Sequence, residues 1–484
     1  MSQVLHAVAR HAFQQPSAIA LSDLESALTY GELQTEVEAA ARALVRLAPL
    51  TRPGAPVAVA MGNGPAWVVL DLALIRLGWP SLPLPGFFTA AQSAHAMADA
   101  GAGLLITDRP AEGAAIEVAG RRLSVEVVDA PPAVLPAGTA KITYTSGSTG
   151  KPKGVCLSQA QMEAVAQSLV EAIGSEYAGR HLPILPLAIL LENVAGLYAT
   201  LLAGGRYHVL CADELGLGNP FAPGVLRLVS VIEREGAESL ILVPELLRAI
   251  LMVLSFTGAR LPRLKLVAVG GAKVSPRLLA QADALGLPVC EGYGLSECAS
   301  VVALNTPAAR RVGAAGRPLA HLQVEIDGEG QIVVGPEGFL GYAGGELHRG
   351  PVRTGDLGRL DADGFLHIDG RADNTIITAY GRNVAPEWVE SELLAQPEIR
   401  QAVVFGEARA GLRALIVPLH HEVGEEAVAA AVARANEALP DYAQVKRWRL
   451  RKPFDPAAGE LTGNGRPRRA ALLANERQFV DAED

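Results

Sequence analysis

The first half of the chain alternates short runs of β-branched residues with segments of helical periodicity. Residues 57–61 (Val-Ala-Val-Ala-Met) have the pattern of a strand and are followed by a Gly-Asn-Gly-Pro turn. Residues 29–32 and 158–161 each have the spacing of a helix capping box, with apolar residues following at helical intervals. Strands that alternate with helices form βα units, so we predict an α/β fold with mostly parallel sheets.

The pattern changes near residue 370. Short predicted strands then interleave with predicted helices; the strands are 375–378, 402–405 and 414–418, and the helices are 387–394 and 425–439. A chain of 484 residues is also too long for one compact core. We therefore predict a large N-terminal domain of several subdomains over residues 1–369 and a small α+β C-terminal domain over residues 370–484.

Composition excludes several classes of protein. Half of the residues are hydrophobic and 19% are charged, which excludes a largely disordered chain. The net charge of -9 gives no basic field, so we expect no nucleic-acid partner. The N-terminus lacks the basic and apolar segments of a signal peptide, and the most apolar stretch, residues 184–205, is interrupted by Pro186 and Glu192. We expect a cytoplasmic protein without a transmembrane segment.

The strongest local signal is the run Thr145-Ser-Gly-Ser-Thr-Gly-Lys-Pro-Lys-Gly154, directly after strand-like residues 142–144. Its glycines allow close backbone approach, its hydroxyl side chains offer donors, and Lys151 and Lys153 supply positive charge. A bound phosphate chain needs these components together. The run is not a Walker A loop, because Pro152 follows Lys151 where Ser or Thr is required. The alternative is a flexible polar loop.

Three further clusters lie downstream. Residues 291–297 place Tyr293 between two glycines, where its ring can lie against a planar base, and include Glu297, an oxygen ligand of the kind Mg²⁺ prefers. Residues 353–358 carry Asp356 on a glycine-flanked turn, where one carboxylate can accept both hydroxyls of a ribose. The last cluster spans residues 369–387. Taken singly, these are also compatible with a turn around a buried tyrosine, an aspartate turn and a solvated charged loop.

Together and in this order, the four clusters resemble the adenylate-forming superfamily: acyl-CoA synthetases, adenylation domains of peptide synthetases, and luciferases. The resemblance covers nearly the whole chain, and it is greatest to fatty acyl-CoA and acyl-ACP synthetases. It implies a small mobile C-terminal domain joined by a hinge near residues 370–373. It also implies that a carboxylic acid reacts with ATP and Mg²⁺ to give an acyl adenylate, whose acyl group passes to CoA or to the phosphopantetheine of an acyl carrier protein.

The resemblance also implies roles for individual residues. Lys153, Glu297 and Arg466 would take part in catalysis, and Glu297 and Thr149 would bind the magnesium ion. Asp373 would be the hinge, and Gly381 would line the thiol channel. The residues implied in ATP binding are Thr145, Ser146, Gly147, Ser148, Thr149, Gly150, Gly270, Gly271, Ala272, Gly292, Tyr293, Gly294, Ser296, Asp356 and Arg371.

The chain departs from the family pattern at Arg466, where the family usually places a lysine. Arginine keeps the positive charge but cannot reproduce the compact geometry of an ammonium group. We therefore expect a slower adenylation step. Arg466 motivates one alternative to an acid–thiol ligase, a nucleotide-binding relative with impaired adenylation. A second alternative, independent of Arg466, is an enzyme that passes the acyl adenylate to a non-thiol nucleophile.

The acid and the acceptor are less well determined by the sequence. Residues 184–202 and 240–256 are expected to form core helices, with an acyl tunnel as the alternative. Lys273 is expected to be solvated, with a contact to a polar substrate group as the alternative. The oligomeric state is open, and a homodimer is one option.

Overall fold

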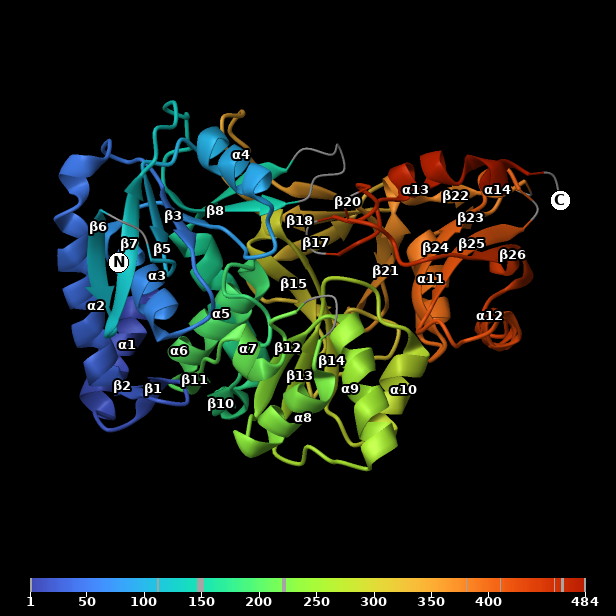
Figure 1. The fold of residues 1–484 in the computed structure, drawn as a ribbon, viewed down its shortest axis with the longest axis horizontal. Coiled ribbons are helices and arrows are strands. Elements are labelled where there is room, and N and C mark those ends of the chain that lie inside the picture. Colours follow the sequence, from blue (N-terminus) through green and yellow to red (C-terminus); the bar gives the residue numbers. More distant parts are fainter. Residues whose placement is uncertain are drawn as a thin grey trace.

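The computed structural model describes residues 2–110, 113–145, 152–219, 223–379, 381–409, 411–456, 458–462 and 465–482. A large N-terminal part and a small C-terminal part lie at opposite ends of the molecule (Figure 1). Two large sheets and a four-stranded sheet build the N-terminal part, and a three-stranded sheet builds most of the C-terminal part.

The first large sheet has nine strands in the order β16-β15-β14-β13-β12-β10-β11-β1-β2. Its six central strands run parallel, and antiparallel strands border them on both sides. The bounds are β1 Ile19–Ser22, β2 Ala27–Thr29, β10 Arg180–His181, β11 Arg206–His208, β12 Ser239–Leu242, β13 Leu266–Val269, β14 Val289–Leu295, β15 Ser300–Leu304 and β16 Arg317–Pro318. One face packs against α8 (Val225–Arg234), α9 (Pro244–Thr257) and α10 (Pro276–Ala284) through a shared apolar core.

The second large sheet has eight strands in the order β19-β9-β8-β4-β3-β5-β7-β6. Its bounds are β3 Val57–Ala60, β4 Ser81–Pro83, β5 Leu104–Thr107, β6 Ala114–Val118, β7 Arg121–Val127, β8 Thr139–Thr145, β9 Lys153–Ser158 and β19 Gly341–Tyr342. Helix α4 (Ala90–Ala100) packs on one face of this sheet. Strands β8 and β9 form the hairpin whose connection, residues 146–151, lies outside the described residues.

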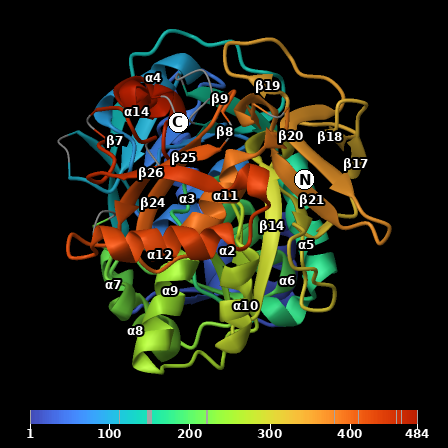
Figure 2. The same ribbon diagram turned by 90° about the vertical axis from the view of Figure 1, so that its right-hand side faces the viewer.

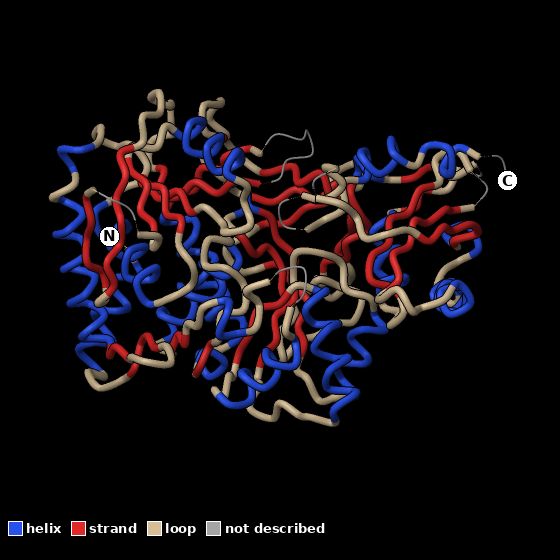
Figure 3. Tube along the Cα trace, viewed as in Figure 1, coloured by secondary structure: helices blue, strands red, loops and turns tan. Residues whose placement is uncertain are grey.

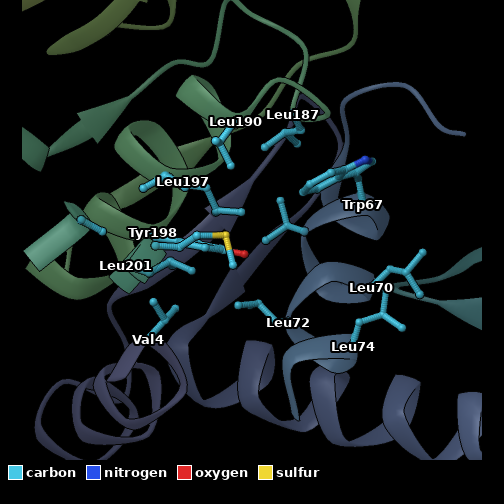
Figure 4. Packing of buried hydrophobic residues seen from close by; sticks show 14 of the residues in the cluster. Val4, Trp67, Leu70, Leu72, Leu74, Leu187, Leu190, Leu197, Tyr198 and Leu201 are labelled. Atoms are coloured by element: carbon cyan, nitrogen blue, oxygen red, sulfur yellow. The ribbon is translucent and has the colours of Figure 1, made fainter. Parts of the chain in front are cut away.

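The main apolar core joins both large sheets through a layer of helices. The helices of this core are α1 (Gln3–Gln14), α2 (Tyr30–Val45), α3 (Pro65–Leu77), α5 (Gln159–Ile173), the π-helical segment η3 (Glu192–Tyr198) and α6 (Ala199–Ala203). Figure 4 shows Trp67 and Leu72 of α3 on the side toward Tyr198 of η3 and Leu201 of α6, and Leu70 and Leu74 on the other side of α3. Residues 66–74 of α3 are buried without exception, so this helix is apolar on nearly every side.

The predicted capping boxes begin α2 and α5. Thr29 accepts a hydrogen bond from the Glu32 amide, and the Glu32 carboxylate accepts one from the Thr29 amide at 2.8 Å. Ser158 and Gln161 make the same pair of contacts at the start of α5. Each box satisfies amide groups that have no partner inside the helix, and this fixes where the helix begins.

One fully polar cluster lies inside this core. The Lys141 ammonium on β8 donates to Asp71 at 2.7 Å, to Asn193 at 2.5 Å and to the Tyr198 hydroxyl at 3.0 Å. Tyr198 and Asn193 in turn donate to the other oxygen of Asp71. The side chains of Lys141 and Asp71 are each 2% exposed. A buried charge is costly unless it is paired, and here the ammonium and the carboxylate pair with each other. The cluster joins α3, β8 and η3.

The four-stranded antiparallel sheet links the two parts of the chain. Its bounds are β17 Gln323–Ile326, β18 Gln331–Gly335, β20 Val352–Leu360 and β21 Leu366–Arg371. The C-terminal part follows, with β22 Ile376–Ile377, β23 Asn383–Val384, β24 Ile399–Phe405, β25 Leu412–Pro418, β26 Val445–Leu450, α11 Pro386–Leu394, α12 Glu425–Asn436, α13 Arg469–Asn475 and α14 Arg477–Asp481. The remaining α-helix of the described chain is α7, Ala212–Leu215.

Helices cover both faces of the sheet β24-β25-β26. Helices α11 and α12 share one apolar core with it, and α13 and α14 share another on the opposite face. Figure 3 shows these strands between helices above and below them, and Figure 2 shows α11 and α12 in front of the larger part. The C-terminal part therefore has apolar cores of its own.

The predicted α/β fold is confirmed, and both large sheets are mixed: their central strands run parallel, and antiparallel strands border them on both sides. Two details of the prediction are wrong. Helix α12 ends at Asn436 rather than 439, because the amides of Ala438 and Leu439 bond to carbonyls three residues back and form turns before Pro440. Residues 240–256 are not one helix, since residues 239–242 form β12 before α9 begins.

Two further observations bear on the chain as a whole. Among the described residues, no helix is both long and apolar enough to cross a membrane. The four cysteines are free thiols, and three of them are buried.

Candidate active site

A cavity of about 3500 Å³ lies where the two parts of the chain meet. The carboxyl ends of β12, β13 and β14, the hairpin β8–β9, and segments around residues 369–374 and 459–471 border it. Ligands of open α/β sheets bind at the carboxyl ends of parallel strands, and this cavity has that position. Most of the residues singled out in the sequence line it.

Tyr293, Asp356 and Arg371 meet on one side of the cavity. The Tyr293 hydroxyl on β14 donates to one oxygen of Asp356 at 2.5 Å, and the Arg371 guanidinium lies 3.3 Å from the other. Strands β20 and β21 pair Asp356 directly with Arg371, which explains their proximity. Burial raises the pKa of the Asp356 carboxyl, and the Tyr293 hydrogen bond and the Arg371 charge oppose that shift. The carboxylate is thus held in place before a ligand arrives.

Glu297, Tyr342 and Lys153 form a second group. The Tyr342 hydroxyl on β19 donates to Glu297 at 3.1 Å, and the Lys153 ammonium lies 5.3 Å from the centre of the Tyr342 ring. Burial, together with the nearby Glu297 charge, raises the pKa of Tyr342 to about 12. Strand β19 pairs with β9, next to Lys153, and so brings the three side chains together. The group places one carboxylate and one ammonium beside the hairpin.

Arg466 reaches this cavity from the C-terminal part. Its guanidinium donates to the backbone oxygen of Gly271, in the segment that follows β13. Gly271 has φ near +88°, a backbone conformation that a side chain would strain, and an added Cβ would lie 3.2 Å from Arg466. A glycine at position 271 therefore allows the arginine to approach the backbone closely.

Lys273 and Glu291 lie next to Gly271: Lys273 follows it by two residues, and Glu291 accepts a hydrogen bond from the Val274 amide. The Lys273 ammonium donates to the Ile368 backbone oxygen at 3.0 Å, and burial lowers the pKa of this lysine. The prediction of a solvated lysine is therefore wrong. Burial raises the pKa of the Glu291 carboxyl to about 7, although its hydrogen bond from the Val274 amide acts in the opposite direction. Glu291 thus anchors the backbone that carries Lys273.

The cavity brings most of the predicted site residues together. Those that line it are Thr145, Lys153, Gly270, Gly271, Ala272, Gly292, Tyr293, Gly294, Ser296, Glu297, Asp356, Arg371, Asp373 and Arg466. Gly381 is exposed and is not among the lining residues. Ser146, Gly147, Ser148, Thr149 and Gly150 lie outside the described residues.

The donor set restricts how a metal ion could bind. The described part of the chain contains no group of three or more His, Cys, Asp or Glu residues that could hold one. Magnesium is commonly bound by one or two carboxylates together with substrate phosphates and water. Glu297 beside the hairpin β8–β9 fits that mode, and a site built from protein ligands alone does not fit the described residues.

Tyr342 is a site residue that the sequence analysis missed. It follows Gly341 in a two-residue strand, about 190 positions after the hairpin that it contacts. A Gly-Tyr pair inside a short strand carries no periodic signal, and its pairing with β9 is non-local. The sequence therefore gave no reason to group Tyr342 with Glu297 and Lys153.

Comparison with known proteins places these features in one family. Residues 8–350 match the model of the AMP-binding enzymes, and residues 373–482 match that of the AMP-binding enzyme C-terminal domain. A feruloyl-CoA synthase from an Amycolatopsis species is 32% identical, with 82% of this chain and 84% of the relative covered. A long-chain-fatty-acid–CoA ligase from Mycobacterium bovis is 27% identical, with 94% and 92% covered.

Solved structures share the fold of this chain. The O-succinylbenzoate coenzyme A synthetase of Bacillus subtilis, in complex with ATP and a magnesium ion, has a TM-score of 0.75 at 22% identity and shares the fold, with 96% of this chain and 98% of that one covered. The amide bond synthetase of Marinactinospora thermotolerans has a TM-score of 0.75 at 25% identity, with 97% and 99% covered. The chain belongs to the AMP-binding, adenylate-forming enzyme family, as an ATP-dependent acid–thiol ligase of the acyl-CoA synthetase type.

Proposed function

We propose that this ligase activates a carboxylic acid with an apolar body and passes the acyl group to the thiol of CoA or of a carrier-protein phosphopantetheine. The observation that carries the proposal is the convergence of cationic side chains from both parts of the chain on one cavity. Lys153 comes from the hairpin, Arg371 from the end of β21, and Arg466 from the C-terminal part. Such a set suits a polyphosphate whose charge increases during reaction.

In the first half-reaction, a carboxylate oxygen attacks the α-phosphorus of ATP, and the bond to pyrophosphate breaks. We assign Asp356 to the ribose hydroxyls and Tyr293 to the adenine, because the hydrogen bond between the two residues fixes both in the cavity. Glu297, with Thr149 of the hairpin connection, would hold the magnesium ion, which neutralises phosphate charge when bound. Lys153 and Arg466 then offset the charge that develops in the transition state.

In the second half-reaction, the thiol sulfur attacks the acyl carbon, the thiol proton is lost to solvent, and AMP leaves. We propose that residues 370–373 form a hinge between domains 1–369 and 370–484, with Asp373 as the pivot. Asp373 lies in a short 3₁₀ turn that follows β21 and is exposed. Rotation there would carry Arg466 out of the cavity and allow the thiol to enter, with Gly381 lining its channel.

The apolar part of the cavity supports the choice of acid. Leu185, Ala188, Ile241 and Leu266 are at most 8% exposed, line the cavity, and lie outside the packed core clusters of the described chain. Buried apolar side chains that face a cavity favour an apolar ligand. The named relatives act on ferulate and on long-chain fatty acids, so aryl and fatty acids are the two classes to compare.

A second candidate function has one observation in its favour. The Marinactinospora amide bond synthetase is as similar in fold as the CoA synthetase above, with 25% identity. An acyl adenylate formed in this cavity could therefore pass to an amine in place of a thiol. The two candidates share the first half-reaction and differ only in the acceptor.

A screen of pyrophosphate release tests the proposal. Aryl and fatty acids of increasing length would be supplied with ATP and Mg²⁺, with CoA, with an amine, or with neither acceptor. We expect acid-dependent release of pyrophosphate and CoA-dependent formation of a thioester, detected by mass spectrometry. Amide formation without thioester formation would favour the second candidate. Pyrophosphate release that is independent of any acid would contradict both.

A further inference from the structure

Arg248 on α9 joins the two parts of the chain. Its guanidinium donates to the backbone oxygen of Leu394 at 2.8 Å, to that of Ile399 at 2.5 Å and to that of Arg400 at 3.4 Å. Leu394 is the last residue of α11, and Ile399 is the first residue of β24. One side chain of the large part therefore binds three carbonyl groups of the small part.

The Arg248 guanidinium lies at the C-terminal end of α11, where a positive charge is favourable. The last carbonyl groups of a helix lack partners within the helix, and the helix dipole makes that end negative. A fork of N–H donors satisfies such carbonyls and places positive charge where it is stabilised. Burial lowers the pKa of Arg248, and the nearby Glu245 charge opposes this shift. The Arg248 guanidinium is thus partly desolvated, and its hydrogen bonds to the carbonyl oxygens of the small part replace hydrogen bonds to water.

A second contact lies along the same helix. The Ser275 hydroxyl at the start of α10 donates to the Glu392 carboxylate on α11 at 3.2 Å, and both residues are buried. The Lys273 charge lies near this carboxylate and counteracts the rise in pKa that burial causes in Glu392. Helix α11 is therefore held at two points, Glu392 and its C-terminus, against α10 and α9.

We infer that Arg248 is a positioning residue that holds the small domain in the orientation where Arg466 reaches Gly271. This inference rests on the proposed function, because it assigns the described orientation to the adenylation step. The carbonyls that Arg248 binds belong to the backbone of α11 and β24, so a rotation of the small domain must break all three hydrogen bonds. Arg248 thereby biases the equilibrium between the adenylating and thiol-transfer orientations.

The kinetic test compares Arg248→Ala and Arg248→Lys with the control Arg260→Ala. Arg260 lies just after α9, and the bonds found for it go only to the neighbouring Gly258 and Ala259 oxygens. We expect Arg248→Ala to slow acid-dependent pyrophosphate release at least tenfold, while thioester formation from preformed acyl adenylate and CoA changes by less than about twofold. Arg248→Lys should restore part of the loss. An equal loss in both half-reactions, or no loss in either, would overturn the inference.

A distance measurement tests the same inference without catalysis. Spin labels at exposed positions of α8 and α12, introduced as Glu233→Cys and Glu426→Cys with Cys211 replaced by serine, would report the orientation of the small domain. We expect one dominant distance with Arg248 present and at least a tenfold larger share of a second distance in Arg248→Ala. An unchanged distance distribution in Arg248→Ala would overturn the inference, whether or not the protein releases pyrophosphate. A lack of pyrophosphate release in the wild-type protein would count against the proposed function alone. Should Arg248→Ala fail to fold, Arg248→Lys gives the same comparison with a smaller shift.

Discussion

At the scale of single residues, Asp356 has the most defined surroundings in the cavity. Tyr293 and Arg371 each occupy one of its oxygens, and the residue is 7% exposed. Arg371 is also the last residue of β21, so the proposed ribose ligand is directly connected to the proposed hinge. This connection would let nucleotide binding influence the orientation of the small domain.

Replacing Asp356 with alanine should weaken ATP binding. The change removes a charged acceptor from the proposed ribose hydroxyls, and hydrogen bonds to charged groups contribute about 1.5–3 kcal/mol each. Calorimetric titration with ATP and Mg²⁺ measures the loss. Asp363→Ala is a matched control, because the exposed Asp363, in the turn between β20 and β21, pairs with the half-buried Arg311 and not with Tyr293 or Arg371. An unchanged affinity in Asp356→Ala would exclude the ribose assignment.

Replacing Arg466 separates its charge from its shape. The arginine reaches Gly271 across the cavity, but its planar guanidinium cannot place one ammonium at the point where charge develops. We expect Arg466→Lys to raise the rate of pyrophosphate release and Arg466→Ala to lower it, since loss of an aimed donor costs about 10²–10³ in rate. Neither should affect thioester formation from preformed acyl adenylate. Identical pyrophosphate release in wild type and both variants would place Arg466 outside the reaction.

At the scale of secondary-structure elements, the cluster of Lys141, Asp71, Asn193 and Tyr198 connects α3, β8 and η3. Strand β8 leads into the hairpin that carries Lys153, and η3 lies beside the apolar wall of the cavity. A fully paired polar cluster fixes the relative positions of these elements more strictly than apolar contacts do. The cluster therefore positions the cavity without facing it.

Lys141→Met should destabilise the protein by about 3–5 kcal/mol, because it leaves the buried Asp71 charge without its counter-ion. Lys265→Met is the matched control: Lys265 pairs with Glu238 at the same distance of 2.7 Å but is 48% exposed. Exposed ion pairs contribute at most about 1 kcal/mol. Chemical denaturation at neutral pH measures both. An equal loss in the free energy of unfolding for the two substitutions would show that burial of the Lys141–Asp71 pair does not increase its contribution to stability.

Glu291 on β14 should make stability depend on pH. Its pKa is about 7 in the folded chain, above the ordinary value of 4.5 for a glutamate side chain. The folded state therefore holds the proton more tightly, so Glu291 lowers the free energy of unfolding as pH rises from about 4.5 to 7, with no further change above that. Glu291→Gln should become more stable relative to wild type across this window, by an amount on the order of 3 kcal/mol. A constant difference between pH 4 and 8 would contradict the account.

Local signals in the sequence predicted where helices begin. Features that depend on contacts between distant parts of the chain were not predicted. Thr29 and Ser158 begin helices because each cap is made within four residues. Strand β26 was not predicted, because its charged residues lack the apolar pattern of a strand and its pairing with β25 is visible only in the structure. Tyr342 and Lys273 acquire their partners across 45 and 95 positions, which no spacing rule in the sequence could reveal.

At the scale of the whole molecule, the cavity depends on both parts of the chain. The large part supplies Tyr293, Glu297 and Lys153, and the small part supplies Arg466. The contacts of Arg248 and Glu392 hold α11 against the large part in this arrangement. In the proposed two-step reaction, these contacts must be strong enough to hold α11 in place during adenylation. They must also be weak enough to break before the thiol step.

Transfer of oxygen from the acid to AMP tests the central claim most directly. In the proposed first half-reaction, one carboxylate oxygen becomes bound to the α-phosphorus and stays with AMP when the thioester forms. With an ¹⁸O-labelled acid, ATP, Mg²⁺ and CoA, mass spectrometry should find one labelled oxygen in each AMP released and none in pyrophosphate. Unlabelled AMP, or ADP as the nucleotide product, would contradict the formation of an acyl adenylate by this protein.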